Sequence, residues 1–442
     1  MLMRRIWMSV LTGLLVTSIL HAQAVNLTEA PLPDRCFRNE LSMQLEGKIT
    51  VKQDGKDVAY PHKAQARHVF MERFLEASDG VGDKAARQYT SAESTITFNN
   101  NDSTKRSLRA ERRFLVTQRI SSHAVTFSPN GVMTREEMEL TEHFDTMAVS
   151  GLVPGKTIDV GKSWKIADRA VAALCELDGL TMHNLEGKLE AVKGNLAQIK
   201  IVGNVQGINL GAQVAMIINA KADFDIKAQR IVALEWNETD ARHQGPVTPS
   251  LSAEVTIKLT RTPIEEPEEL NKIALVKVPT TKAPPAELTN IRHDDPKNGY
   301  TLHHARSWHV VSPEDGPQLV LRHLERGDFI AQATITSWKK ADPKNVMAIG
   351  DFADLMAKTL GWAEDKEIER KEFKAEERAK GHHAVYRVVA SGTLDGVATV
   401  QHFYLIVSPQ GEQRIVTFSV VPQHVQRLGA RDLELIRELA FP

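Results

Sequence analysis

The stretch HHAVYRVVASGTLDGVATVQHFYLIVSPQGEQRIVTFSVV, residues 382–421, decides how the last third of the chain folds. The turn sequences TLDG and SPQG divide it into three runs rich in β-branched and aromatic residues, which predicts an antiparallel meander. Because neighbouring side chains point to opposite faces of a strand, Val400 and Tyr404 share one face, and Phe403 and Leu405 share the other. Both faces are apolar, and such a sheet needs cover on each side.

Two amphipathic segments are available as cover, GDFADLMAKTLGW at 350–362 and ARDLELIRELAF at 430–441. Each has apolar residues at the three- and four-residue spacing of a helix: Phe352, Leu355, Met356 and Leu360 in the first, and Leu433, Ile436, Leu439 and Ala440 in the second. Further strands are expected at QLVLRH and FIAQATITSW. We therefore predict an α/β/α sandwich with an antiparallel sheet for residues 298–442.

The segment NGYTLHHARSWHVV, 298–311, predicts the first two strands of that sheet, with Trp308 as a core anchor. This opening, the two helices and the meander resemble the PsbP-like α/β/α sandwich, over about a third of the chain. The resemblance implies a binding or assembly module without catalysis, and no residue roles carry over from it. The sequence departs from the family at Ala305-Arg306-Ser307, where proline often precedes the tryptophan.

The histidines of this segment do not predict a metal site. Neighbours on a strand face opposite ways, so His303 and His304 cannot converge on one ion without a bulge, and His309 lies beyond a turn. The pair His382 and His383 is excluded for the same reason. We predict no metal, no cofactor and no catalytic residue.

Residues 25–262 predict a mainly antiparallel β domain, a curved sheet or half-barrel with one helix at 167–177. The turn SPNG, 128–131, predicts a hairpin whose second strand is VMTREEMELTEHF, 132–144. Its first arm is basic and its second acidic, which favours charge pairing between the strands over a nucleic-acid surface: Arg106, Arg109, Arg112, Arg113 and Arg119 against Glu136, Glu137, Glu139 and Glu142.

This first domain resembles, more weakly, exported bacterial half-barrel β-proteins of unknown function, including lipoprotein carriers that hold acyl chains under a curved sheet. The phrase GLVPGKTIDVGKSW carries that resemblance. The same phrase nearly contains a phosphate loop, but Gly151 lies four residues before Gly155, Gly155 lies six before Gly161, and the motif needs five. Turns and a short strand are the better interpretation. Between the domains, prolines at 263, 267, 279, 284, 285 and 296 predict a partly stiff linker over 263–297, with one short strand at 273–278.

The first 24 residues have the composition of a secretory signal peptide. Arg4 and Arg5 precede an apolar run from Ile6 to Leu20, and Ala22-Gln23-Ala24 predicts cleavage after Ala24. The run is shorter than the roughly 20 residues a membrane anchor needs. We expect a secreted or periplasmic protein without a transmembrane span after cleavage, with a formal charge of −3, from −1 less two arginines. That near-neutral balance favours no nucleic-acid partner.

Two cysteines, Cys36 and Cys175, leave two alternatives open. Export makes a disulfide between them possible, and closing so long a loop would remove about 5 kcal/mol of unfolded-state entropy. Alternatively, Cys175 is a small buried apolar residue of the helix at 167–177. Spacing alone does not decide between them.

The preferred function is an exported, non-enzymatic binding or scaffold protein of a bacterial envelope, with residues 298–442 as a docking module for an envelope protein. The alternative is a carrier whose N-terminal curved sheet shelters a lipid or other apolar ligand. A hydrolase is third: the sequence has no G-x-S-x-G and no H-E-x-x-H motif, but 16 histidines and many acids leave a catalytic triad open.

Overall fold

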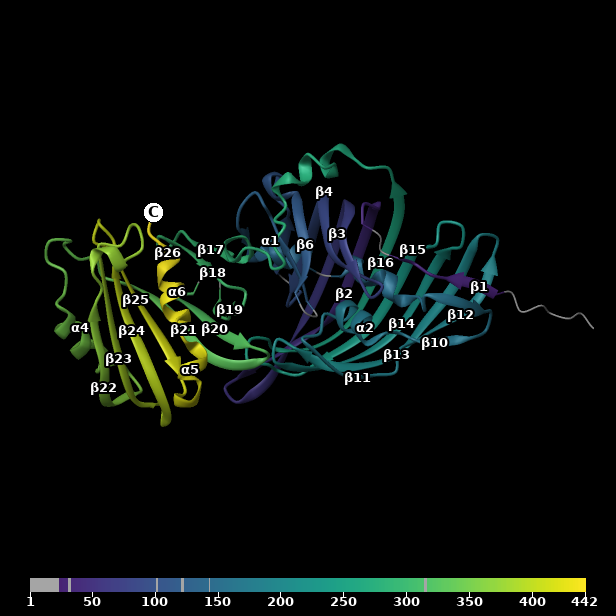
Figure 1. Cartoon of the computed structure of the whole chain (residues 1–442). Helices are drawn as coiled ribbons and strands as arrows, with labels where there is room; N and C mark the ends of the chain where they lie inside the picture. Colours follow the sequence, from purple (N-terminus) through teal and green to yellow (C-terminus); the bar gives the residue numbers. More distant parts are fainter. Residues whose placement is uncertain (1–23, 31–32, 101, 121–122, 143, 314–315) are drawn as a thin grey trace, which may run out of the picture.

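The computed structural model describes residues 24–30, 33–100, 102–120, 123–142, 144–313 and 316–442. The expected signal peptide lies outside this range, apart from Ala24. Antiparallel sheets dominate the described residues, which confirms the prediction of a β-rich chain (Figure 1). Within the same residues, every helix is too short or too polar to cross a lipid bilayer.

The largest sheet has thirteen strands and curves through the right half of Figure 1. Its order is β10-β12-β13-β14-β15-β16-β2-β3-β4-β6-β7, with β11 paired to β13 and β5 to β4. The strands are β2 Cys36–Gln53, β3 Lys56–Ser78, β4 Val81–Phe98, β5 Asp102–Ser107, β6 Phe114–Ile120, β7 His123–Phe127, β10 Ser163–Lys165, β11 Gly179–His183, β12 Glu186–Lys193, β13 Leu196–Asn209, β14 Ala212–Asp225, β15 Arg230–Arg242 and β16 Ser250–Ile264. Beside it, β1 Ala24–Leu27 pairs with β9 Lys156–Asp159.

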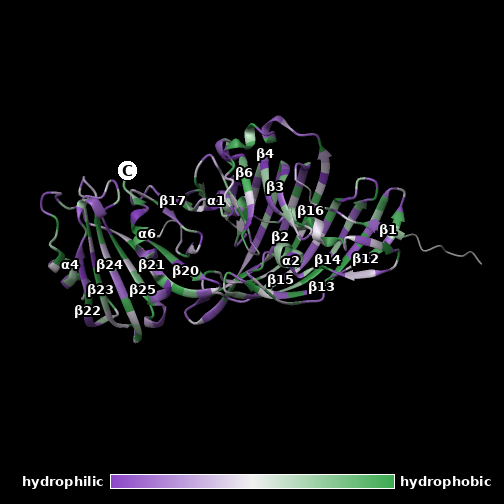
Figure 2. Ribbon diagram, in the orientation of Figure 1, coloured by the Kyte–Doolittle hydropathy of each residue, from purple (hydrophilic) through white to green (hydrophobic). Residues whose placement is uncertain are grey.

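Period-two alternation builds the core of this sheet. Along β14, buried apolar residues such as Met216 and Ile218 alternate with exposed ones, seen as colour bands in Figure 2. Helix α2, Asp168–Leu174, lies on the buried face and adds Val171 and Leu174 to the same cluster. The predicted helix at 167–177 is therefore present, although it ends earlier because Glu176 adopts φ +52°.

The predicted second strand of the SPNG hairpin is wrong. After the two-residue strand β8, Met133–Thr134, the chain forms helix α1, Arg135–Thr141. A capping box starts it: the backbone N–H of Glu137 donates to the Thr134 hydroxyl at 3.4 Å, and the Glu137 carboxylate accepts from the Thr134 backbone N–H at 3.1 Å. This reciprocal cap stabilises a helix where the charge pattern alone fitted a strand.

The predicted charge pairing occurs, but between the first arm and this helix. Arg106 contacts Glu139 at 2.7 Å, and Arg109 contacts Glu137 at 2.6 Å. The first arm is itself interrupted by the 3-10 helix η1, Ala110–Arg112. A second 3-10 helix, η2 Thr146–Leu152, follows α1 and is buried against α2 and β4.

The predicted linker is ordered along the rim of the large sheet. It contains η3 Glu268–Leu270, η4 Ala274–Lys277 and α3 Ala286–Thr289, so the strand expected at 273–278 is wrong. The Asn271 side chain accepts hydrogen bonds from the backbone of Ile273 and Ala274, both at 2.9 Å, and this local bonding favours a helical turn over a strand.

A four-stranded sheet joins the two halves of the chain in the order β26-β18-β17-β8, with β17 Ile291–Asp295, β18 Tyr300–His304 and β26 Leu439–Ala440. Strand β8 pairs in parallel with β17. The expectation that 300–302 and 308–310 begin one sheet is therefore wrong, because β18 belongs here while β19, Trp308–Val310, pairs with β20. The partners of β18 come from distant parts of the chain, which local pattern does not reveal.

The remaining sheet has seven strands in the order β19-β20-β21-β25-β24-β23-β22. Its other strands are β20 Gln318–Glu325, β21 Asp328–Trp338, β22 Trp362–Glu372, β23 Ala384–Leu394, β24 Val397–Val407 and β25 Gln413–Val420. Val400 and Tyr404 lie in one apolar cluster and Phe403 and Leu405 in another, so β24 has the two apolar faces predicted for it. The turns TLDG and SPQG lie where expected.

Helices contribute to both clusters. Helix α4, Ile349–Met356, adds Phe352 and Met356 to one, while α5 Val425–Leu428 and α6 Arg431–Arg437 pack in the other. Leu360, expected on the stripe of α4, is instead 97% exposed because the helix has already ended. Leu439 and Ala440, expected in the last helix, form β26. Two short 3-10 helices complete this half, η5 Ala375–Glu377 and η6 Pro422–His424.

Candidate functional site: a cavity between the two halves

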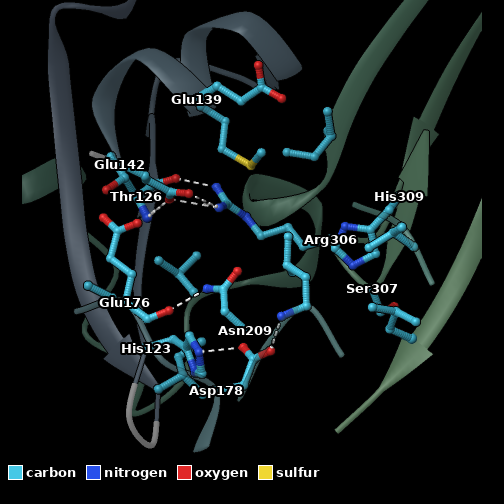
Figure 3. A pocket seen from close by; sticks show the side chains of 18 of the residues that line it. His123, Thr126, Glu139, Glu142, Glu176, Asp178, Asn209, Arg306, Ser307 and His309 are labelled. Carbon is cyan, nitrogen blue, oxygen red and sulfur yellow. Dashed lines mark hydrogen bonds and ion pairs between the residues drawn. The ribbon is translucent and has the colours of Figure 1, made fainter. Parts of the chain in front are cut away.

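A cavity of about 910 Å³ lies between the N-terminal half, residues 24–264, and the C-terminal half, residues 291–442. Strands β6 and β7 and helix α1 wall it on one side, and β18, β19 and the β20–β21 turn wall it on the other (Figure 3). Apolar side chains from both halves line it: Ile120, Val125, Met138, Phe144, Ile208, Leu210, Val247, Ile291, Trp308, Val310 and Leu324. A space of this size accommodates an organic ligand of several hundred daltons.

Arg306 joins the two walls. It lies in the turn between β18 and β19, and its Nη1 donates to both carboxylate oxygens of Glu142, at 2.8 and 3.0 Å. Its Nε donates to the Thr289 carbonyl at 3.0 Å, and Nη2 donates to the Thr126 carbonyl. Glu142 also accepts from the Thr126 backbone N–H at 2.7 Å, so one arginine connects β7, α1 and α3 (Figure 3). A charge-assisted network of this kind fixes the relative position of the walls.

Two strand turns make a second contact between the halves. A Cβ on Gly211, in the β13–β14 turn, would lie 2.4 Å from the Gly327 carbonyl oxygen in the β20–β21 turn. Both glycines have positive φ, +76° and +84°, so a side chain at either is disfavoured by space or by backbone conformation. Nearby, Arg322 Nη1 donates to the Pro246 carbonyl at 2.5 Å.

The buried face of β15 becomes charged near the cavity. Trp236 is fully buried, and the next residues on its face are Glu238, Asp240 and Arg242, of which Arg242 lines the cavity. The Trp236 indole N–H donates to Glu238 at 2.8 Å, and Arg242 lies 3.5 Å from Asp240. Burial raises the pKa of Glu238 to about 7 and also raises the pKa of Asp240, which Arg242 opposes.

Glu176, two residues after the end of α2, reaches the cavity (Figure 3). Its side chain is exposed to the open space of the cavity. Desolvation, together with the negative charges of Glu142, Glu238 and Asp145, raises the pKa of Glu176 to about 8, against the attraction of Arg242. This carboxyl therefore binds a proton more readily than an ordinary glutamate.

A histidine–carboxylate pair lies beside Glu176 in Figure 3. His123 Nε2 in β7 lies 2.7 Å from Asp178 Oδ1, and both side chains are partly exposed. Asp178 also accepts from the backbone N–H of Leu210, which ties the start of β11 to the β13–β14 turn. The pair therefore helps to position three segments of the cavity wall.

The structure separates the three histidines of the opening segment in the C-terminal half. His304 and His309 line the cavity, and burial lowers the pKa of both, that of His304 to about 4. His303 instead lies 3.6 Å from Glu438. Across the described ranges, no three histidine, cysteine or acidic side chains come together as metal ligands.

The two cysteines are buried in different surroundings. Cys36 is the first residue of β2, and Cys175 is the C-cap of α2 within the largest apolar cluster. Burial raises the pKa of both thiols. Neither is part of a disulfide in this structure, and we expect both thiols to be free.

Two features of the sequence lie at this site, but neither was predicted to be functional. In WNETDAR, 236–242, the apolar face of a strand continues as Glu238 and Asp240, an interruption of the core pattern that often marks a functional site. Arg306 lies in Ala305-Arg306-Ser307, the stretch where the sequence departs from the PsbP resemblance. Neither of these two features of the sequence indicates a cavity, because the walls of the cavity come from segments about 200 residues apart.

No protein-family model matches the chain, and no curated protein matches it. Among solved structures, cyanobacterial PsbP from Synechocystis sp. PCC 6803 is 13% identical, with a TM-score of 0.28, over 37% of this chain and 98% of that one. Lipovitellin is 7% identical, with a TM-score of 0.28, over 52% of this chain but only 25% of its own. A DUF1329 family protein from Desulfovibrio piger is 10% identical, with a TM-score of 0.12, over 55% and 92%. Likenesses at these scores carry no argument for a family or a function.

Proposed function

We propose that this chain is an exported, non-enzymatic binding protein that holds an amphipathic small molecule in the cavity between its halves. The observation that carries the proposal is the cavity itself, about 910 Å³ and lined from both halves by apolar and charged side chains. The proposal includes the expected organisation: a curved sheet over 25–262, a connector over 263–297 and a PsbP-like sandwich over 298–442.

The lining favours a ligand with an apolar body and a polar end. Phe144, Ile208 and Trp308 offer apolar surface, and burying apolar ligand area contributes about 25 cal/mol per Å². Glu176 and Arg242 offer a carboxyl and a guanidinium that can orient a polar group. A purely apolar molecule leaves these polar groups without a partner, at a cost in affinity.

This proposal develops the carrier hypothesis and moves its site from the concave N-terminal sheet to the boundary between the halves. The docking hypothesis is less favoured because part of the C-terminal half already contacts the N-terminal half. Strand β17 pairs with β8, and Arg306 binds Glu142. Any docking partner must therefore use the surfaces that these contacts leave open.

Native mass spectrometry of the protein isolated from its own host tests the proposal. We expect a bound organic molecule that is lost on denaturation, and a lower occupancy in Gly179→Leu. Gly179 lines the cavity, and an added Cβ there meets no atom within 4 Å, so the leucine occupies ligand space without a clash. Thr181→Leu, on the same strand but outside the cavity, is the matched control.

Three outcomes contradict the proposal. They are isolation of the protein free of any small molecule, full occupancy in Gly179→Leu, and an equally strong loss of occupancy in Thr181→Leu. Capture of a stoichiometric protein partner, without a small molecule, supports the docking hypothesis instead. Turnover of an ester or amide that is abolished by Glu176→Gln supports a hydrolase, since a carboxyl with a raised pKa is suited to act as a general acid.

A further inference from the structure

Two aliphatic side chains project from the connector into solvent. Ile273 and Val276 are 82% and 84% exposed, and they lie three residues apart at η4. In a 3-10 helix, side chains at this spacing lie one above the other on the same side. The segment crosses above the end of β4 at the top of Figure 1, on the outside of the large sheet's rim.

The backbone that carries this pair is firmly held. Leu270 and Val278 on either side of it are buried in an apolar cluster with strand residues of the large sheet. The buried Arg73 donates to the Leu270 carbonyl at 2.6 Å, and the buried Lys84 donates to the Pro279 carbonyl at 2.5 Å. The exposure of the two side chains is therefore a fixed feature of the surface, not the result of a loose loop.

The surroundings of the pair are basic. Residues 271–282 contain Lys272, Lys277 and Lys282 and no acidic residue. Lys272 and Lys282 are exposed, and the Lys277 ammonium lies 3.7 Å from the centre of the Phe114 ring. Four exposed glutamates, at 265, 266, 268 and 269, lie before this stretch, and the Glu266 carboxylate is 2.9 Å from the buried Arg73. The lysines therefore make the aliphatic tip itself the basic part of the connector.

We propose that this tip, hereafter the η4 knob (Ile273 and Val276 with Lys272, Lys277 and Lys282), binds the surface of an anionic lipid bilayer. The two aliphatic side chains enter the boundary between headgroups and acyl chains, and the lysines contact the headgroups. A bilayer fits better than a protein, because a stable protein interface needs roughly 800 Å² from each partner and two aliphatic tips supply a small part of that.

Binding by one knob is weak and depends on salt, because it combines a small apolar area with surface charge. The η4 knob is separate from the cavity, since none of its residues lines it. Membrane binding by the η4 knob suits a protein that exchanges an amphipathic molecule with a membrane, but it depends on the knob residues alone.

Co-sedimentation with phosphatidylethanolamine–phosphatidylglycerol vesicles tests the proposal. The protein used begins at Val25, so that the apolar run at 6–20 does not bind lipid itself. We expect the double variant Ile273→Asp, Val276→Asp to lose about tenfold or more of the vesicle-bound fraction. Leu360→Asp is the matched control, because Leu360 is 97% exposed on the other half of the chain. All substituted positions are exposed, and equal melting temperatures confirm that the variants fold.

A fluorescent environment-sensitive label placed at Ile273→Cys should shift to shorter wavelength when vesicles are added, and the same label at Leu360→Cys should not. Added salt should reduce binding to the anionic vesicles, and binding to neutral phosphatidylcholine vesicles should be weaker than binding to the anionic ones. The proposal is overturned if the unsubstituted protein does not bind vesicles, if the double variant binds equally well, or if Leu360→Asp loses as much binding.

Discussion

His323 makes the stability of the C-terminal half depend on pH. The side chain is 1% exposed in β20, and its ring centre lies 4.9 Å from that of Trp308. Neither ring nitrogen meets a hydrogen-bond partner among the described residues. Burial, reinforced by the positive charge of Arg431, lowers the pKa of His323 from 6.5 to about 4. Folding therefore requires the neutral imidazole, and we predict that acid destabilises this half.

The sign follows from proton binding. Between pH 6.5 and 4 the unfolded chain carries a proton on His323 and the folded chain does not, so stability is complete above 6.5 and falls as the pH is lowered. Each unit of pKa difference corresponds to about 1.4 kcal/mol. The free energy of unfolding should therefore fall by on the order of 2 kcal/mol at about pH 5 through this group alone.

His323→Phe removes the titrating group and keeps an aromatic ring against Trp308. We expect urea unfolding, followed at about pH 7.5, 6 and 5, to show on the order of 2 kcal/mol less acid destabilisation in the variant than in the wild type. His243→Phe, at an exposed position, is the control for loss of one imidazole. Parallel stability curves for wild type and His323→Phe, or an NMR titration of His323 near 6.5, would refute the reasoning.

Three further predictions concern the boundary between the halves and the thiols. Arg306→Lys cannot reproduce the bonds to Glu142 and to the two backbone carbonyls, so it should weaken the contact between the two halves by about 1–3 kcal/mol. We expect faster amide hydrogen exchange in β8 and β17, and unchanged exchange contradicts this prediction. Glu176→Gln keeps a neutral side chain at pH values where the wild-type carboxyl ionises. The melting temperature of the variant, relative to that of the wild type, should therefore rise as the pH increases from 4.5 to about 8. A difference in melting temperature that does not change with pH excludes the raised pKa. Thiol titration of unfolded, non-reduced protein should find both Cys36 and Cys175 free; a count of zero means that they pair.

Local pattern was sufficient where side-chain alternation and turn chemistry agree. The strands around TLDG and SPQG lie as predicted because β-branched residues on both faces leave a buried strand as the only stable choice for that segment. The same patterns failed at 132–144 and 273–278. There, the reciprocal cap between Thr134 and Glu137, and the two backbone hydrogen bonds that the Asn271 side chain accepts, stabilise helical turns and outweigh weak strand preferences.

The site was beyond local pattern for a different reason. Arg306 and Glu142 are 164 residues apart, and their contact depends on how two sheets are placed against each other. The sequence shows each as a charged residue near a turn. Only the folded chain decides that one arginine connects three segments, and that Glu176 lies where desolvation and neighbouring carboxylates raise its pKa.

By itself, the sequence determined that this protein is built from antiparallel strands, that its last sheet is apolar on both faces, and that helices near each end of that region cover it. These properties follow from the period of side chains along a strand or helix, which each short segment carries within itself. The tertiary structure alone decided which strands share a sheet, that the connector packs on the sheet's rim, and that a cavity lies between the halves. Such features arise from contacts between distant residues, whose free energy depends on relative position and burial rather than on the order of neighbours along the chain.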